Sequence, residues 1–120
     1  MIDPKTLQRA LAAGTVLQVA MVVAGHFVPF VALHVFALGG MAISALAGLV
    51  YGRTAAAYGG AALGGAIAGG GCALIGIALS VLMGDTQAMI LAIGTVSSAL
   101  TGAIGGALGR LIFARAATPA

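Results

Sequence analysis

The stretch that decides the fold is YGGAALGGAIAGGGC, at residues 58–72. Glycine is this dense inside an apolar segment only where a second backbone has to come very close. From residue 60 onward a small residue recurs at every fourth position, at Gly60, Gly64, Ala68, Cys72 and Gly76. Because an α-helix has 3.6 residues per turn, this spacing forms one smooth face of the small-xxx-small kind by which membrane helices pack. The stretch therefore predicts a helix that packs closely inside a bilayer.

The composition of the whole chain agrees with a membrane environment. Of its 120 residues 62% are hydrophobic and 6% are charged, and its mean hydropathy is +1.20. Soluble domains are roughly half apolar and a quarter charged. The composition predicts an all-α integral membrane protein that forms a single domain over residues 1–120. The five basic residues are scattered singly, so no nucleic-acid surface is expected.

Turn signals divide the chain into apolar runs long enough to cross a bilayer. We expect four transmembrane helices, over about residues 5–24, 29–51, 55–83 and 87–113. Asp3 and Pro4 are typical of a helix start, and Thr54 is placed to cap the third helix. Gly84 is placed to end that helix. A signal peptide is the alternative interpretation of the first run, because Lys5 and Arg9 precede it.

Two other spans repeat the four-residue spacing of small residues. In the second span the stripe is Gly40, Ser44, Gly48 and Gly52. In the fourth span two stripes run side by side, one of Gly94, Ser98, Gly102 and Gly106 and one of Ser97, Thr101, Gly105 and Gly109. A helix with two neighbouring small faces can be approached closely by two partners. The sequence thus predicts helix packing through small-xxx-small glycine stripes.

The two halves of the chain are similar when one is shifted by 57 residues. The shift superposes Gly48 on Gly105 and the pair at 52–53 on the pair at 109–110. This predicts two helical hairpins in parallel orientation, related by an axis along the membrane normal. The alternative is that any two spans rich in glycine and alanine align this well.

The basic residues also predict the orientation. They are Lys5, Arg9, Arg53, Arg110 and Arg115, and all fall on one side of a four-span protein. By the positive-inside rule both termini are cytoplasmic, and the protein is expected in the cytoplasmic (inner) membrane. The aromatic residues near the predicted interfaces are interpreted as an aromatic belt of Phe27, Phe30, Tyr51 and Tyr58.

Few residues in the chain could carry chemistry. No acidic or basic residue lies in the middle of a span, and paired carboxylates and catalytic triads are absent from the sequence, so we expect no enzyme and no metal site. In length and number of spans the chain is similar to the small multidrug exporters. The acidic residue that those proteins need in their first span has no counterpart here.

Three polar positions remain as candidates. His26 and His34 lie toward the non-cytoplasmic side, where an imidazole could ligate haem or chlorophyll, although no cofactor is predicted. Their simpler interpretation is a turn residue and a hydrogen bond to a neighbouring helix. Gln18, with Ser97 and Thr101, could line a narrow polar path; alternatively the hydroxyls bond their own helix and Gln18 bonds across an interface.

We therefore expect a non-enzymatic membrane protein that contacts lipid and either itself or other transmembrane helices. It would act as a homo-oligomer or as an accessory subunit of a larger membrane complex, because its small faces exceed the need of one bundle. A passive channel or facilitator for a small solute or ion is the alternative. A subunit that holds haem or pigment through His26 or His34 is the third hypothesis.

Overall fold

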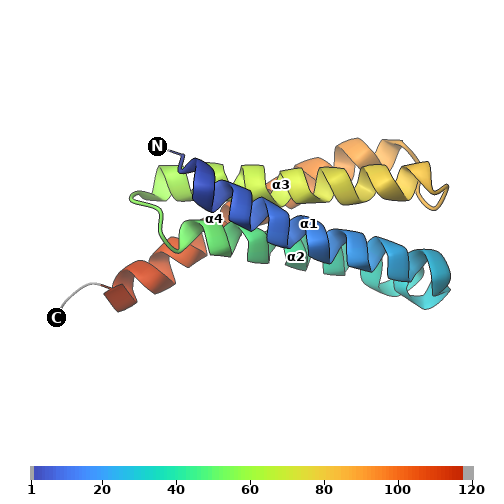
Figure 1. Ribbon diagram of the computed structural model, residues 1–120, viewed down its shortest axis with the longest axis horizontal. Coiled ribbons are helices and arrows are strands. Elements are labelled where there is room, and N and C mark those ends of the chain that lie inside the picture. The colour runs from blue at the N-terminus through green and yellow to red at the C-terminus, as the bar shows by residue number, and fades with distance from the viewer. Residues whose placement is uncertain (1, 118–120) are drawn as a thin grey trace.

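The computed structural model describes residues 2–117, and side chains throughout that range except at 32, 33 and 114–117. Four α-helices and one π-helix follow one another: α1 (Pro4–Phe27), η1 (Val31–Val35), α2 (Phe36–Gly52), α3 (Tyr58–Leu82) and α4 (Met89–Ala117) (Figure 1). The described residues contain no strand. Three segments are long and apolar enough to cross a membrane, namely Pro4–Phe27, Tyr58–Leu82 and Met89–Phe113, whereas α2 is shorter.

The first helix begins and ends where local chemistry requires. Asp3 is its N-cap, and the Asp3 carboxylate accepts hydrogen bonds from the Lys5 backbone N–H at 3.2 Å and the Thr6 hydroxyl at 2.6 Å. Pro4 fits the first turn because its missing N–H has no helical partner there. The helix ends at Val28, whose backbone is extended because a residue before proline avoids the helical region.

The break between α3 and α4 is a Schellman turn. Gly84 has a φ of 80°, which glycine adopts without strain. Its N–H donates to the carbonyl of Val81, and the Asp85 N–H donates to the carbonyl of Ser80, each at 3.0 Å. These two bonds satisfy carbonyl groups that the end of α3 would otherwise leave free.

The prediction that Thr54 caps the third helix is wrong. The helix α3 begins at Tyr58, and its N-cap is Ala57, which provides no side-chain bond. The reason is that the last turn of α2 continues through this segment: the Arg53 N–H donates to Leu49 at 3.0 Å and the Ala55 N–H donates to Gly52 at 3.3 Å. Thr54 therefore lies in the turn that directly follows α2.

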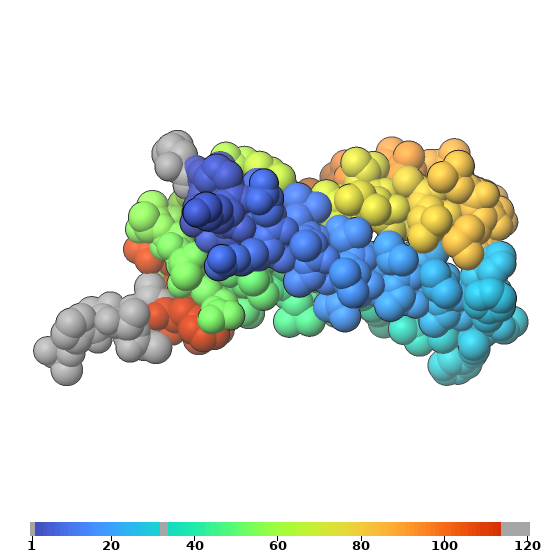
Figure 2. Space-filling view, viewed as in Figure 1, coloured from blue at the N-terminus to red at the C-terminus, as the bar shows by residue number. Residues whose placement is uncertain are grey.

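The helices form an elongated bundle of 51 × 22 × 20 Å in which α2 and α3 lie between the other two. The most extensive packing joins α3 to α4, followed by α2 to α4, whereas within the described residues α1 contacts α2 and α3 but not α4. Figure 2 shows α1, in blue, lying across one face of the molecule. The helix α4 therefore packs on the opposite face of the α2–α3 pair.

Backbones touch where α2, α3 and α4 meet. A Cβ added to Gly69 would lie 2.8 Å from the Cα of Gly102 and 2.9 Å from the carbonyl oxygen of Ser44. A Cβ on Gly48 or on Gly65 would overlap the backbone of Gly102. Glycine is required at these positions because any side chain would hold the three helices apart.

The two small faces of α4 point to different neighbours. Along one face Gly94 lies against Ile77, and Gly102 and Gly106 lie against the backbone of α3. Along the other, Gly105 lies against the backbone of Ala45 and Gly109 against that of Leu49, both in α2. Both faces are thus occupied inside one chain, so the surplus of small faces that favoured an oligomer is not found on α4.

The interpretation of Tyr51 as a belt residue is wrong, because its side chain is only 2% exposed. Its ring packs against Gly64, and its hydroxyl oxygen accepts a hydrogen bond of 3.0 Å from the Asp3 N–H. A glycine opposite the ring leaves room for a tyrosine in the core, and the polar tip finds a partner at the bundle end.

Candidate functional site

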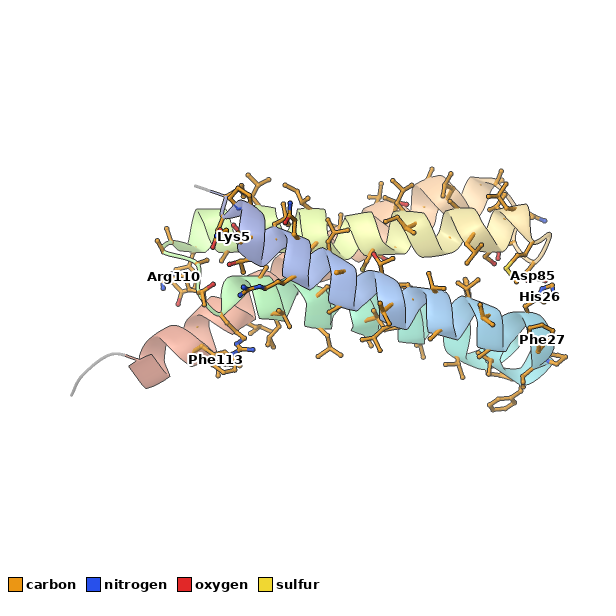
Figure 3. The ribbon with its side chains drawn as sticks, in the orientation of Figure 1. Lys5, His26, Phe27, Asp85, Arg110 and Phe113 are labelled. Carbon is orange, nitrogen blue, oxygen red and sulfur yellow. The ribbon has the colours of Figure 1, made fainter. Side chains whose placement is uncertain are left out.

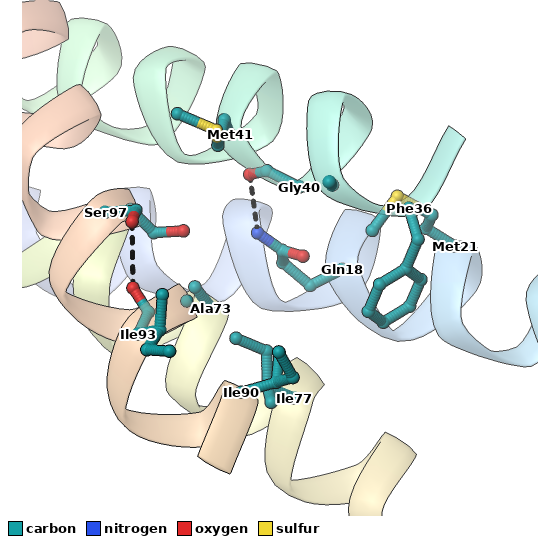
Figure 4. Close-up of a pocket in the computed structure, with 13 residues that line it drawn as sticks. Gln18, Met21, Phe36, Gly40, Met41, Ala73, Ile77, Ile90, Ile93 and Ser97 are labelled. Carbon is teal, nitrogen blue, oxygen red and sulfur yellow. Dashed lines mark hydrogen bonds between the residues drawn. The ribbon is translucent and has the colours of Figure 1, made fainter. Parts of the chain in front are cut away.

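The main candidate site is a cavity of about 220 Å³ between the α1–α2 pair and the α3–α4 pair. All four α-helices line it (Figure 4), with Gln18 and Met21 from α1, several residues between 36 and 41 from α2, Ala73 and Ile77 from α3, and residues between 90 and 98 from α4. Most of the lining atoms are apolar. The cavity thus has the usual character of a small-molecule site, which is an apolar chamber with few polar groups.

The mouth of this cavity opens on the side of the bundle. Four lining residues are exposed at the molecular surface, Ala37 and Met41 on α2 and Ile90 and Ile93 on α4. Met41 lies well inside the second apolar segment, away from either loop. The opening therefore lies between α2 and α4, on the flank of the bundle rather than at its end.

Gln18 is the central polar residue of the cavity, and it is only 2% exposed. Its Nε2 donates to the Gly40 carbonyl oxygen at 3.0 Å and to the Ser44 hydroxyl at 3.3 Å. At the contact of α1 with α3, a Cβ added to Gly76 would lie 2.9 Å from the Gln18 Cβ. The glycine in α3 therefore leaves room for the Gln18 side chain. The amide thereby joins α1 to α2 in the middle of the bundle.

The hydrogen bond that the Ser44 hydroxyl donates determines which end of the Gln18 amide points to α2. The Ser44 hydroxyl donates to the Gly69 carbonyl at 3.0 Å, and the Cys72 thiol donates to the same oxygen at 3.3 Å. Since the proton of Ser44 is used in this way, its oxygen and the Gly40 carbonyl both act as acceptors toward Gln18. The amide nitrogen must face them, which leaves Oε1 on the cavity side without a hydrogen bond to any described residue.

Two neighbouring serines of α4 line the cavity in different hydrogen-bonding states. The Ser97 hydroxyl donates to the Ile93 carbonyl of its own helix at 2.8 Å. Ser98 is 4% exposed, and its hydroxyl takes part in none of the hydrogen bonds between the described side chains. Thr101 does not line the cavity, and its hydroxyl donates to the Ser98 carbonyl at 3.0 Å. Of the proposed polar path, Gln18 and Ser97 come together and Thr101 stays apart.

The two histidines have separate partners. The interpretation of His26 as a turn residue is wrong, because α1 continues to Phe27 and His26 lies in its last turn. The His26 Nδ1 is 2.7 Å from the Asp85 carboxylate. His34 lies in η1, where its ring is 4.8 Å from that of Phe30. The structure thus pairs each imidazole with a different neighbour, and the His26–Asp85 contact joins the end of α1 to the α3–α4 connection.

Charged and aromatic groups gather at the opposite end (Figure 3). The Arg110 guanidinium donates to the Ala55 carbonyl at 3.3 Å and lies over the Tyr58 ring at 5.0 Å, while Arg53 lies over Phe113 at 5.1 Å. At the start of α1 the Thr6 hydroxyl bond holds the pKa of the Asp3 carboxyl below its usual value. These contacts anchor the helix ends at this end of the bundle.

The remaining predicted packing positions are distributed along α2 and α3. Ala68 and Cys72 belong to the buried core with Ala10, Ala47 and Tyr51. Gly40 lies beside Gln18, Gly52 lies against the backbone of Gly106, and Gly60 is half-buried near the start of α3.

Several cavity residues had no signal in the sequence. Phe36, Met41 and Ile90 read as ordinary apolar positions of a span, and only the pairing of the helices brings them around one space. The contact of His26 with Asp85 joins residues 59 apart in the chain.

Among residues 2–117 no group of three or more His, Cys, Asp or Glu side chains is placed to hold a metal ion. In comparisons with known proteins, no protein family, no curated protein and no solved structure matches the chain.

Proposed function

We propose that this chain is a non-enzymatic integral membrane protein that holds a small, bilayer-dissolved molecule in the cavity between its two hairpins, and that it serves as a ligand-binding accessory subunit. The observation that carries the proposal is the cavity itself, which is apolar and opens on the flank of the bundle. A site that opens toward hydrocarbon selects ligands that are already dissolved in the membrane.

The proposal includes four spans with both termini cytoplasmic. The helical residues of η1 and α2 together cover 31–52, roughly 30 Å at 1.5 Å per residue, which is about the thickness of the hydrocarbon core. Lys5 and Arg110 lie at one end of the bundle, and His26 and Asp85 lie at the other (Figure 3). This distribution favours an orientation with the basic end in the cytoplasm. The parallel hairpin repeat remains a prediction.

A passive channel is less well supported by the geometry. The cavity is lined mostly by apolar atoms, whereas a path for a polar solute or ion needs polar groups along its length. Toward the basic end the backbones of α2, α3 and α4 are in contact at Gly48, Gly65 and Gly102. A polar solute that reached Gln18 would therefore meet closely packed backbone beyond it.

Association with other helices remains part of the proposal, but the surface that would contact them consists of large apolar side chains rather than glycine stripes. Glycines of α2, α3 and α4 face one another inside the chain, and large apolar side chains lie on the outside. Along α4 these are Ile93, Val96, Leu100, Ile104 and Leu108, each at least 44% exposed. They favour contact with lipid chains or with the side chains of a partner subunit.

Mass spectrometry of the protein with its lipids tests the function. Protein released from cells in polymer nanodiscs should carry one small apolar molecule per chain. The variant Ala37→Phe places a large ring at the cavity mouth and should lose this molecule, whereas Leu82→Phe, at an exposed site away from the cavity, should keep it. If the bound species are the same in both variants, the cavity does not hold the ligand.

A further inference from the structure

We propose that the cavity recognises a hydroxyl group, so that its ligand is a small apolar alcohol or phenol that enters from the bilayer. This inference rests on the proposed function, because it names the chemical class of the molecule that the cavity holds. The observations behind it are two polar residues of the cavity lining that are largely buried, Gln18 at 2% and Ser98 at 4% exposure. The hydrogen bonds of the described residues leave Gln18 Oε1 and Ser98 Oγ unused.

The first polar atom is an acceptor. Nε2 of Gln18 is held by the Gly40 carbonyl and the Ser44 hydroxyl, so the amide cannot turn its nitrogen toward the cavity without losing both bonds. The oxygen on the cavity side accepts hydrogen bonds and cannot donate one. A ligand that satisfies it must carry an O–H or N–H group.

The second polar atom both donates and accepts. Ser98 differs from its neighbour Ser97, whose proton is used by the Ile93 carbonyl of the same helix. A hydroxyl group can both donate and accept a hydrogen bond, so it can donate to Gln18 or accept from Ser98. A hydrocarbon would leave both groups unpaired at a depth where no water compensates for the loss.

The size of the cavity limits the rest of the ligand. A cavity of about 220 Å³ is somewhat larger than the engineered apolar cavity of about 150 Å³ that binds benzene. One aromatic ring, or an alkyl segment of similar size, fills most of it. The lining by Met21, Phe36, Ile77 and Ile90 suits such a body, and Met in particular adapts to different shapes.

The test compares matched ligands by fluorine NMR on the protein in nanodiscs, with empty nanodiscs subtracted. The probes are 4-fluorobenzyl alcohol, its methyl ether and 4-fluorotoluene, which share a ring and differ in the polar group. The alcohol should bind most tightly and fluorotoluene least. The ether accepts from Ser98 but cannot donate to Gln18, so it should bind between them.

Two adjacent serine variants provide the internal control. Ser98→Ala should lower the affinity for the alcohol about fivefold, which corresponds to one net hydrogen bond, and should leave the affinity for fluorotoluene unchanged. Ser97→Ala should change neither affinity, because that hydroxyl is satisfied by its own helix.

The outcomes separate the inference from the function on which it rests. Equal binding of the alcohol and fluorotoluene, or an unchanged alcohol affinity in Ser98→Ala, would overturn the hydroxyl assignment while the cavity remains a binding site. If no probe shows saturable binding, and Ala37→Phe behaves as the parent chain does, both the assignment and the proposed function are refuted.

Discussion

Individual glycines differ in whether the neighbouring helix leaves room for a side chain. Gly105 lies so close to α2 that an added Cβ would overlap the Ala45 carbonyl group, whereas a Cβ on Gly59 would meet nothing within 4 Å. The sequence shows both as glycines of an apolar helix. Only the position of the neighbouring backbone tells them apart.

This difference predicts opposite effects of the same substitution. Gly105→Ala should destabilise the protein by about 2 kcal/mol, because overpacking forces α2 and α4 apart. Gly59→Ala should be neutral or should stabilise by up to about 1 kcal/mol, because alanine is the better helix former. The measurement is the unfolding free energy of both variants in mixed detergent micelles. A stable Gly105→Ala protein would show that α2 and α4 do not approach as described.

At the scale of elements, the helices themselves were largely predictable and their ends were less so. The predicted spans 5–24 and 87–113 correspond to α1 and α4, because long apolar runs between turn signals have few alternatives. Thr54 shows why ends are harder: a threonine after an arginine looks like a cap, yet backbone bonds to Leu49 and Gly52 extend the preceding helix. The pairing of α4 with both α2 and α3 needed the three-dimensional structure to assign each face.

The loops between elements give a test of orientation. Thr54 and Gln87 are both exposed, in the α2–α3 and α3–α4 connections at opposite ends of the bundle. In intact bacterial cells that express the protein, a membrane-impermeant thiol reagent should label Gln87→Cys at once and Thr54→Cys only after permeabilisation. The parent chain is the control, because its Cys72 is buried. The reverse labelling pattern would place both termini outside.

For the whole molecule, the sequence indicated that Gln18 needs a partner, but it did not predict the cavity. Gln18 stood out because an amide in the middle of a span needs a partner, and the structure provides Gly40 and Ser44. The apolar walls gave no signal, because a side chain that lines a cavity and one that faces lipid look alike in a sequence. The cavity arises because glycines bring the helices together toward one end, while larger residues such as Phe36 and Ile77 surround a space toward the other.

The proposed function requires that a bilayer-dissolved ligand occupies the space between the two hairpins. The chain has no tryptophan, so one introduced residue provides a specific fluorescent reporter. Ile90→Trp places it on the cavity wall, and Ile104→Trp places it on the outer face of the same helix, away from the cavity. With the protein in nanodiscs, 4-bromobenzyl alcohol should quench Ile90→Trp saturably and Ile104→Trp only in linear proportion to the alcohol in the membrane. The same linear quenching of both reporters would contradict the claim.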